Sequence, residues 1–187
     1  QTVPTPEPYS DIASHWAHDS IVRASDLGLF SGTGDGKFSP DSEMTRGMLA
    51  TALWRMAGSP EPTKNAGFSD VSSGAWYYKA VNFCAEKGIV TGVSQAAFDP
   101  DGIVTREQMA AMVFRYLKYM GKGPQGLWMI NLEYTDKADI SDYAFEGVTY
   151  CTMKGLFVGK LGNVFDPQGT ATRAETAVVL VRLKDLA

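Results

Sequence analysis

One pattern occurs three times in this chain of 187 residues, and this repetition constrains the fold more than any other feature. A separation of 60 positions relates the first unit to the second, and one of 67 relates the second to the third. The matched sets are Trp16, Trp76 and Tyr143; Gly28, Gly88 and Gly155; Gly32, Gly92 and Gly159; Phe38, Phe98 and Phe165; Pro40, Pro100 and Pro167; Thr45, Thr105 and Thr172; and Arg46, Arg106 and Arg173. Such repetition predicts stacked units that complete one another's core.

Proline- and glycine-rich segments separate the units. We expect repeats at 9–57, 68–120 and 134–187, joined by linkers at 58–67 and 121–133, and together forming one compact domain. Within the second linker, the apolar run 127–130 is predicted to pack back on the body. Residues 1–8 are rich in proline and indicate an extended linker, expected either to follow a removed signal peptide or to belong to a longer chain.

Each unit is predicted to be a helix, a loop and a second helix. The first helix begins near Trp16 and stops at Gly28, and the equivalent glycines repeat that stop. The second helix begins after a threonine, and Thr105 and Thr172 are each followed by Gln or Glu at the third helical position, which makes a capping box. Thr45 lacks this partner. The fold class is therefore mainly α, with three helix-loop-helix repeats around a pseudo-threefold axis.

The three units should share one core, because a single helix pair cannot bury its apolar face. We expect Phe38, Phe98 and Phe165 in that core. Cys84 and Cys151 occupy one equivalent position, where the first unit has Ala24. Small residues permit close approach, so we predict that the first helices line the axis and that these three residues form one buried layer. Buried free thiols are expected, with a disulfide across the axis as the alternative.

Composition excludes several classes of function. The net charge of −4 disfavours a nucleic-acid binder, and no apolar run reaches the roughly 18 residues of a membrane helix. Two histidines cannot build a His-rich metal site. The loop starting at Asp99 fails the EF-hand pattern, because Ile103 and Ala110 stand at ligand positions 5 and 12. No sequence signal pairs two carboxylates across a cleft. We expect no catalysis, no metal and no cofactor.

The ordered motifs resemble the S-layer homology domain. Each unit opens with an aromatic residue, Ser or Thr, and Asp (Tyr9-Ser10-Asp11, Phe68-Ser69-Asp70, Tyr134-Thr135-Asp136), and Thr-Arg opens its second helix. The resemblance implies a pseudo-threefold module that attaches extracellular proteins to the envelope of bacteria, mostly Gram-positive. It further implies a secondary cell-wall polysaccharide as partner, ending in N-acetylmannosamine with a ketal-linked pyruvate, bound in grooves between repeats. A cargo domain would belong to the longer parent chain. The alternative is a protein-protein or S-layer lattice interaction module.

The second-helix start offers chemistry for an anion independently of that resemblance. A helix N-terminus has free N–H groups and partial positive charge. Arg46, Arg106 and Arg173 stand at its first position, where a guanidinium can hold a carboxylate with two hydrogen bonds. We expect each arginine to be partly exposed in a groove. The alternative is a capped helix start whose arginine is merely solvated.

The remaining candidate residues each leave two interpretations open. Trp16 and Trp76, with Tyr143 in the third repeat, could stack on a sugar ring or seat the first helix in the core. The glycines could permit a turn at positive φ or let backbone N–H groups approach the sugar. The aspartates could bind sugar hydroxyls or fix the entry turn of each repeat. These last two sets are Gly32, Gly92 and Gly159, and Asp11, Asp70 and Asp136.

Overall fold

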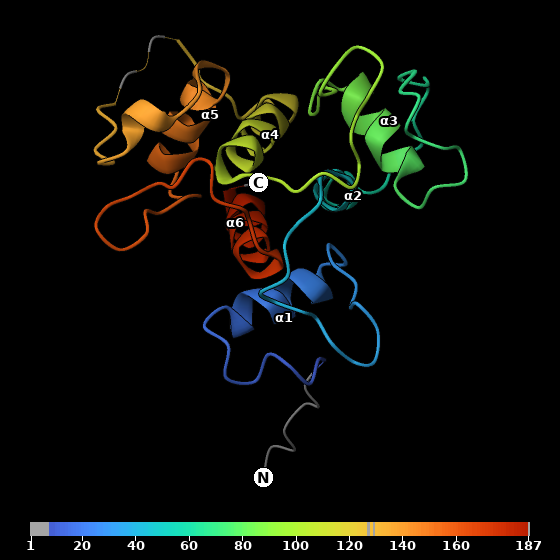
Figure 1. Ribbon diagram of the computed structural model, residues 1–187, viewed down its shortest axis with the longest axis horizontal. Helices are drawn as coiled ribbons and strands as arrows, with labels where there is room; N and C mark the ends of the chain where they lie inside the picture. Colours follow the sequence, from blue (N-terminus) through green and yellow to red (C-terminus); the bar gives the residue numbers. More distant parts are fainter. Residues whose placement is uncertain (1–7, 127, 129, 187) are drawn as a thin grey trace.

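The computed structural model describes residues 8–126, 128 and 130–186, and within them it is mainly α (Figure 1). Six α-helices and one short 3-10 helix appear in this part of the chain, with isolated β-bridges but no strand. The helices are α1 His18–Asp26, α2 Arg46–Met56, α3 Tyr78–Glu86, α4 Arg106–Tyr119, η1 Lys137–Asp139, α5 Asp142–Met153 and α6 Arg173–Leu186. The predicted fold class is confirmed. Residues 1–7 of the expected linker, and residues 127 and 129 of the apolar run, lie outside the described residues.

The second helices begin where the threonines predict. Thr105 accepts a hydrogen bond from the Gln108 backbone N–H, and the Gln108 side chain accepts one from the Thr105 N–H, completing the capping box. Thr172 and Glu175 form the same pair of hydrogen bonds, each 3.1 Å long. Thr45 accepts only the single bond from the Met48 N–H. Local sequence therefore fixes these three helix starts, as expected.

A closed ring of backbone hydrogen bonds holds the three repeats together just before the second helices. The N–H of Met44 donates to the Ala171 carbonyl, that of Ala171 to the Val104 carbonyl, and that of Val104 to the Met44 carbonyl, over 2.8–2.9 Å. Each repeat thus donates to one neighbour and accepts from the other. This cycle establishes the pseudo-threefold arrangement and makes the three repeats one body.

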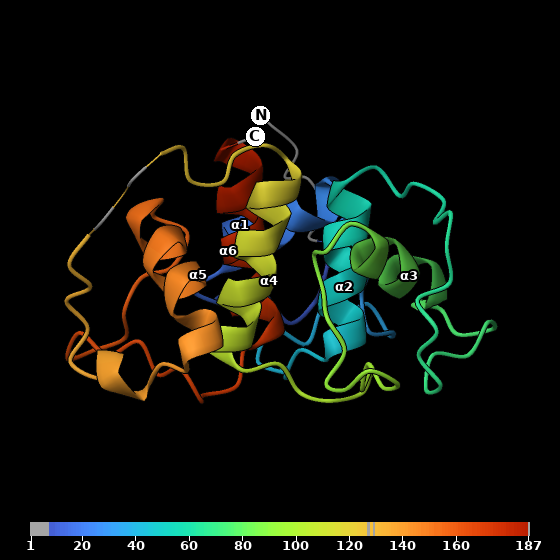
Figure 2. The same cartoon turned by 90° about the horizontal axis from the view of Figure 1, so that it is seen from above.

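The second helices, not the first, lie at the centre of the molecule. Figures 1 and 2 show α2, α4 and α6 standing side by side around the axis, with α1, α3 and α5 at the three corners. The Thr176 hydroxyl of α6 lies 3.5 Å from the Met109 sulfur of α4. Each first helix packs mainly against the second helix of the preceding repeat: α3 on α2, α5 on α4, and α1 on α6. The prediction that the first helices line the axis is wrong.

The small residues of the first helices serve these outer helix pairs. The Cys84 thiol lies 3.5 Å from the Ala50 carbonyl oxygen, and the Cys151 thiol lies 3.7 Å from that of Ala110. Ala24, Cys84 and Cys151 are fully buried, but in three separate interfaces rather than one layer. These small residues do permit close approach, as expected. Their packing partners are the neighbouring second helices and not the other first helices. Both thiols are free and buried, as expected.

Phe38, Phe98 and Phe165 are fully buried members of the hydrophobic core, as predicted. Each ring lies beneath an arginine of another repeat: Arg173 over Phe38, Arg46 over Phe98 and Arg106 over Phe165, at 4.5, 4.6 and 5.2 Å from guanidinium carbon to ring centre. The phenylalanine in the core of each repeat is therefore covered by the first residue of another repeat's second helix. No helix in the described residues has the length and apolar character needed to cross a bilayer.

Candidate ligand-binding grooves

Three grooves occupy equivalent positions between the repeats. We number them by the arginine that begins the adjoining second helix: groove 1 holds Arg46, groove 2 Arg106 and groove 3 Arg173. Their cavity volumes are about 420, 150 and 470 Å³ respectively. The three grooves are therefore unequal in size although they are built alike.

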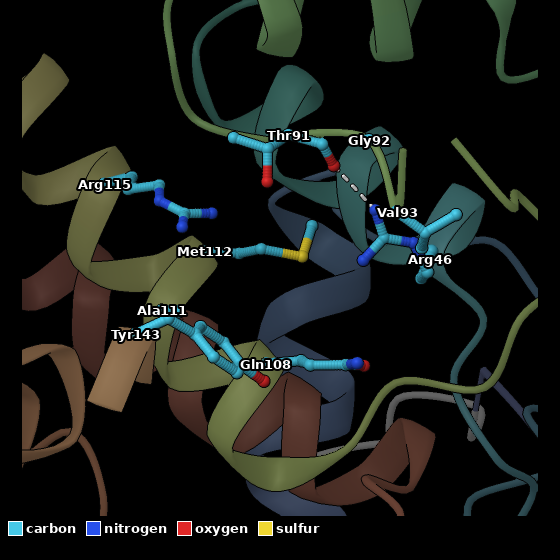
Figure 3. Close-up of a pocket in the computed structure, with 9 residues that line it drawn as sticks. All are labelled: Arg46, Thr91, Gly92, Val93, Gln108, Ala111, Met112, Arg115 and Tyr143. Carbon is cyan, nitrogen blue, oxygen red and sulfur yellow. Dashed lines mark hydrogen bonds between the residues drawn. The ribbon is translucent and has the colours of Figure 1, made fainter. Parts of the chain in front are cut away.

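All three repeats contribute to every groove. One repeat supplies the arginine that begins its second helix, which we call the first arginine of the groove. The next repeat supplies a loop and a stretch of its second helix, and the third supplies an aromatic residue. In groove 1 these are Arg46, the loop 91–93 with α4, and Tyr143 (Figure 3). Groove 2 combines Arg106, the loop 156–160 with α6, and Trp16. Groove 3 combines Arg173, the loop 29–33 with α2, and Trp76. Each groove is therefore lined by residues from all three repeats.

The first arginines are buried rather than partly exposed, which corrects the expectation. Arg46, Arg106 and Arg173 are 8%, 5% and 5% exposed. The Nε of Arg46 donates to the Phe98 carbonyl and its Nη2 to the Thr91 carbonyl, both at 2.8 Å. Arg106 and Arg173 donate in the same way to the Phe165 and Val158 carbonyls and to the Phe38 and Ser31 carbonyls. Each guanidinium thus orders the loop that lines its own groove.

The N–H groups at the second-helix starts are occupied as well. The N–H of Arg46 donates to the Gly102 carbonyl and that of Gly47 to the Pro100 carbonyl, and the other two helices repeat this arrangement. The third N–H of each helix is capped by its threonine. Open N–H groups are expected at this helix end from the sequence, but the neighbouring repeat accepts hydrogen bonds from the first two. These helix N–H groups are therefore not open to an anion.

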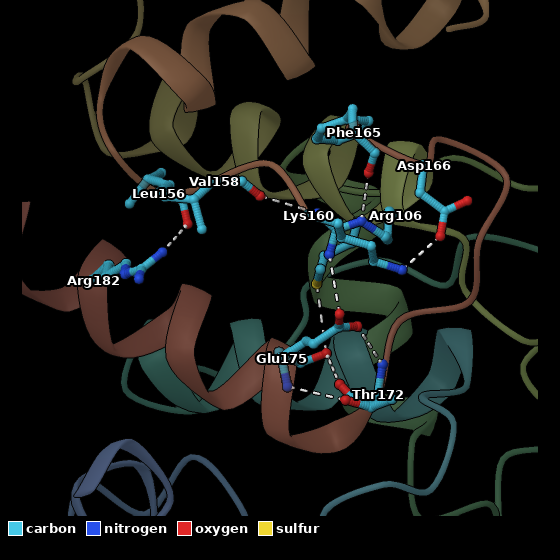
Figure 4. A network of polar contacts seen from close by, with 11 residues as sticks. Arg106, Leu156, Val158, Lys160, Phe165, Asp166, Thr172, Glu175 and Arg182 are labelled. Atoms are coloured by element: carbon cyan, nitrogen blue, oxygen red, sulfur yellow. Dashed lines mark hydrogen bonds and ion pairs between the residues drawn. The ribbon is translucent and has the colours of Figure 1, made fainter. Parts of the chain in front are cut away.

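The third guanidinium nitrogen, Nη1, distinguishes the grooves. In groove 2, Nη1 of Arg106 donates to the Glu175 carboxylate at 3.2 Å (Figure 4). Within the described residues, no group accepts a hydrogen bond from Nη1 of Arg46 or Arg173. Burial lowers the pKa of both guanidinium groups, which nevertheless stay charged because arginine titrates so far above neutrality. Grooves 1 and 3 therefore each retain a charged donor.

A second arginine lines every groove, and sequence reasoning missed it. Arg55, Arg115 and Arg182 obey the same separations of 60 and 67 positions, so the repeat alignment could have found them. Groove 1 contains Arg115, groove 2 Arg182 and groove 3 Arg55. Arg55 donates to the Leu29 carbonyl at 3.2 Å, and Arg182 donates to the Leu156 carbonyl at 3.1 Å. Two guanidinium groups thus face each groove from different repeats.

The aromatic residues are exposed, which favours stacking on a ligand over a place in the core. Trp16, Trp76 and Tyr143 are 68%, 60% and 54% exposed. The hydroxyl of Tyr143 donates to the buried Glu107 carboxylate at 2.9 Å. Partial burial and this bond raise the pKa of Tyr143 to about 12, so the phenol is neutral at neutral pH. Each groove therefore has a flat, uncharged aromatic face beside its arginines.

The glycines of the lining loops are required by close packing. A Cβ on Gly32 would lie 2.8 Å from both the Lys37 carbonyl oxygen and the Tyr9 ring. A Cβ on Gly92 would lie 2.3 Å from the Ser94 carbonyl oxygen, and one on Gly159 would lie 2.9 Å from the Tyr134 ring. None of the three has positive φ, so the turn interpretation is wrong. All three glycines line their grooves.

The aspartates fix the loops and lie outside the groove linings. Asp11 accepts hydrogen bonds from the Phe38 and Ser39 N–H groups. Asp70 and Asp136 each bind the equivalent pair of N–H groups, at distances of 2.7–2.9 Å. Burial alone would raise the pKa of the Asp11 and Asp70 carboxyls, but these N–H donors outweigh it and lower both pKa values. These aspartates therefore stabilise the loops by binding backbone N–H groups, and they do not line the grooves. The described residues contain no cluster of His, Cys, Asp and Glu that could hold a metal ion.

The arrangement and order of these motifs correspond to one family. The profile of the S-layer homology domain matches residues 8–47, 67–110 and 133–177, over half of the chain and once in each repeat. The chain belongs to the S-layer homology domain family. Its three S-layer homology repeats coincide with the three units that the hydrogen-bond ring joins.

Bacterial surface proteins and enzymes contain similar segments. The chain is 30% identical to an amylopullulanase of Thermoanaerobacterium thermosulfurigenes over 94% of its own length but only 9% of that protein. It is 27% identical to a surface-layer 125 kDa protein of Lysinibacillus sphaericus, covering 90% of this chain and 14% of that one. It is 26% identical to a cellulosome-anchoring protein of Acetivibrio thermocellus, covering 88% and 38%. The chain thus spans a small part of each relative.

Proposed function

We propose that this chain is a non-catalytic module that attaches a larger protein to a bacterial cell wall by binding a pyruvylated secondary wall polysaccharide in its grooves. The observation that carries the proposal is the pairing, in every groove, of two arginines with an exposed aromatic residue. A ligand with a sugar ring and a carboxylate matches this pairing.

The chemistry of the match is specific. A pyruvate ketal places a carboxylate directly on the sugar ring, and a guanidinium binds a carboxylate through short, charge-assisted hydrogen bonds. An aromatic face buries the apolar side of the sugar ring. Because the first arginines are already fixed by carbonyl oxygens, binding would cost little side-chain entropy. Removing the pyruvate would leave the guanidinium groups without their partner.

The relatives support the same role. Their names include surface-layer, cell-wall and cellulosome-anchoring proteins, which agrees with an extracellular place at the wall. In the relatives that are enzymes, such as the amylopullulanase, the matching segment is a small fraction of the protein. We assign the catalytic activity to the rest of those proteins and to no part of this chain. A cargo domain in a longer parent chain would then supply whatever activity is displayed on the surface.

A sedimentation assay with purified wall fragments tests the proposal. The chain should co-sediment with pyruvylated walls and should remain in solution with walls from which mild acid has removed the pyruvate. In a parallel experiment, the chain is mixed with a surface-layer protein that has been freed of wall material. Binding that survives pyruvate removal would contradict the proposal, and binding only to the surface-layer protein would favour a protein-protein or lattice module.

A further inference from the structure

The three grooves differ in whether a carboxylate lines them, and the difference traces to one equivalent position on the second helices. This position is Met48 in groove 3, Gln108 in groove 1 and Glu175 in groove 2. The Glu175 carboxylate occupies Nη1 of Arg106 and lies in the groove itself. Neither groove 1 nor groove 3 is lined by a carboxylate. Groove 2 is also lined by Lys160, but its ammonium is paired with the Asp166 carboxylate. An anionic ligand would therefore meet a lining carboxylate in groove 2 alone.

Arg115 separates groove 1 from groove 3. Its equivalents Arg55 and Arg182 donate to loop carbonyls, whereas Arg115 makes no hydrogen bond or ion pair within the described residues. Its side chain is half-buried, and Figure 3 shows its guanidinium on one side of the groove and that of Arg46 on the other, with Met112 between them. A half-buried cation that has given up part of its hydration without gaining a partner favours a bound anion.

The electrostatics of groove 1 support the same conclusion. Besides burial, the charge of Arg115 contributes to the lowered pKa of Arg46, so the two guanidinium groups repel each other across the groove. The Asp99 carboxylate raises the pKa of Arg46 and acts on it more strongly than Arg115 does, but it does not line the groove. The polar group acting on Arg115 is the phenol of Tyr143, which is neutral at neutral pH. An anion between Arg46 and Arg115 would remove this repulsion.

We propose that groove 1 is the principal anion-binding groove, that Arg46 and Arg115 bind the ligand carboxylate from opposite sides, and that Glu175 makes groove 2 the weakest. This inference rests on the proposed function, because it ranks the grooves for the same carboxylate-bearing sugar. Tyr143, positioned by Glu107, provides the aromatic face of the principal groove.

The chain provides its own reporters for a test. Grooves 2 and 3 contain Trp16 and Trp76, whereas groove 1 contains Tyr143 and no tryptophan. The probe is the methyl glycoside of N-acetylmannosamine with a ketal-linked pyruvate, titrated while NMR signals are followed. Backbone N–H signals of residues 91–93 should move at the lowest concentrations. The indole N–H of Trp76 should move later and that of Trp16 last.

Matched variants locate the effect. Arg115→Gln should weaken the tightest site on the order of 10- to 100-fold, whereas Arg55→Gln, the same change in groove 3, should leave that site unchanged. Arg115→Lys, which keeps the charge without the planar fork, should recover part of the affinity. Glu175→Gln should strengthen binding reported by Trp16, and its glutamine can still cap the helix because Gln108 does so in the second repeat. A thermal melt of each variant separates lost binding from lost folding.

The outcomes distinguish the two claims. If the wild-type chain binds the pyruvylated saccharide in no groove, the proposed function fails and this ranking fails with it. If the wild-type chain binds but a folded Arg115→Gln variant keeps its tightest site, the ranking alone is overturned. Movement of the Trp16 indole before the signals of residues 91–93 would overturn it too.

Discussion

The Nε of Arg173 donates a 2.8 Å hydrogen bond to the Phe38 carbonyl, joining residues 135 positions apart in the chain. The same guanidinium donates to the Ser31 carbonyl and lies over the Phe38 ring. The last repeat is thus attached to the first in the same way that Arg46 and Arg106 join the other neighbours. Each of these arginines both closes the molecule and lines a groove.

This double role predicts that Arg173→Ala loses stability as well as binding. The change leaves carbonyl groups without their charged donor, and we expect a loss of about 1.5–3 kcal/mol in the free energy of unfolding. The control is Arg23→Ala, which removes a surface ion pair with Asp185 and should cost about 0–1 kcal/mol. Urea unfolding followed by circular dichroism measures both. Equal stability of the two variants would contradict the role of Arg173 in closure.

Acid should destabilise the protein through Asp11 and Asp70. Their pKa values are lowered in the folded state, so each contributes stability above the unfolded pKa of about 3.9 and loses it as the pH falls through the folded value. The double variant Asp11→Asn, Asp70→Asn should be less stable at pH 7 and should lose less additional stability on acidification. Urea midpoints measured between pH 6 and pH 2 provide the comparison. Parallel curves for the two proteins would show that these carboxylates do not carry the acid sensitivity.

The cysteines should be unreactive in the native state. Burial raises the pKa of the Cys84 thiol to about 12 and also raises that of Cys151, so the thiolate population at pH 8 is very small. The two thiols lie in separate helix interfaces, which disfavours a disulfide between them. A chromogenic thiol reagent should detect neither cysteine until denaturant is added, and then both. Rapid reaction of the folded protein would contradict this packing.

Gly92→Ala should disturb the loop that lines groove 1. The new Cβ would lie 2.3 Å from the Ser94 carbonyl oxygen and 2.5 Å from that of Ala97, so the backbone must shift. We expect a loss of about 1–3 kcal/mol in stability and weaker ligand binding. Gly74→Ala in the same repeat is the matched control, because a Cβ there meets nothing within 4 Å. Thermal melts that do not separate the two variants would refute the close-packing explanation.

The sequence predicted the elements well because their signals are local. Threonine caps fix where the second helices start, glycines follow the ends of the first helices, and the repeat alignment fixes their number. The partner of each first helix is not a local property. Small residues at the position of Ala24 indicate close approach, but a neighbouring second helix and a shared axis satisfy that requirement equally. For this reason the prediction that the first helices line the axis is wrong.

The site was predicted only in part for a related reason. The first arginines stand beside a conspicuous helix cap, whereas Arg115 lies on the middle of a helix where charged residues are ordinarily solvated. Only the groove formed with another repeat gives it a place in the candidate site. The burial of Arg46 likewise depends on carbonyl groups of the following repeat, about 50 residues away, which no spacing in the sequence indicates.

A crystal structure of the chain with the pyruvylated methyl glycoside tests the central claim most directly. We predict that the ligand occupies groove 1, with its carboxylate within hydrogen-bonding distance of Arg46 and Arg115 and its ring against Tyr143. Ligand density outside all three grooves, or a carboxylate directed away from both arginines, would contradict the account.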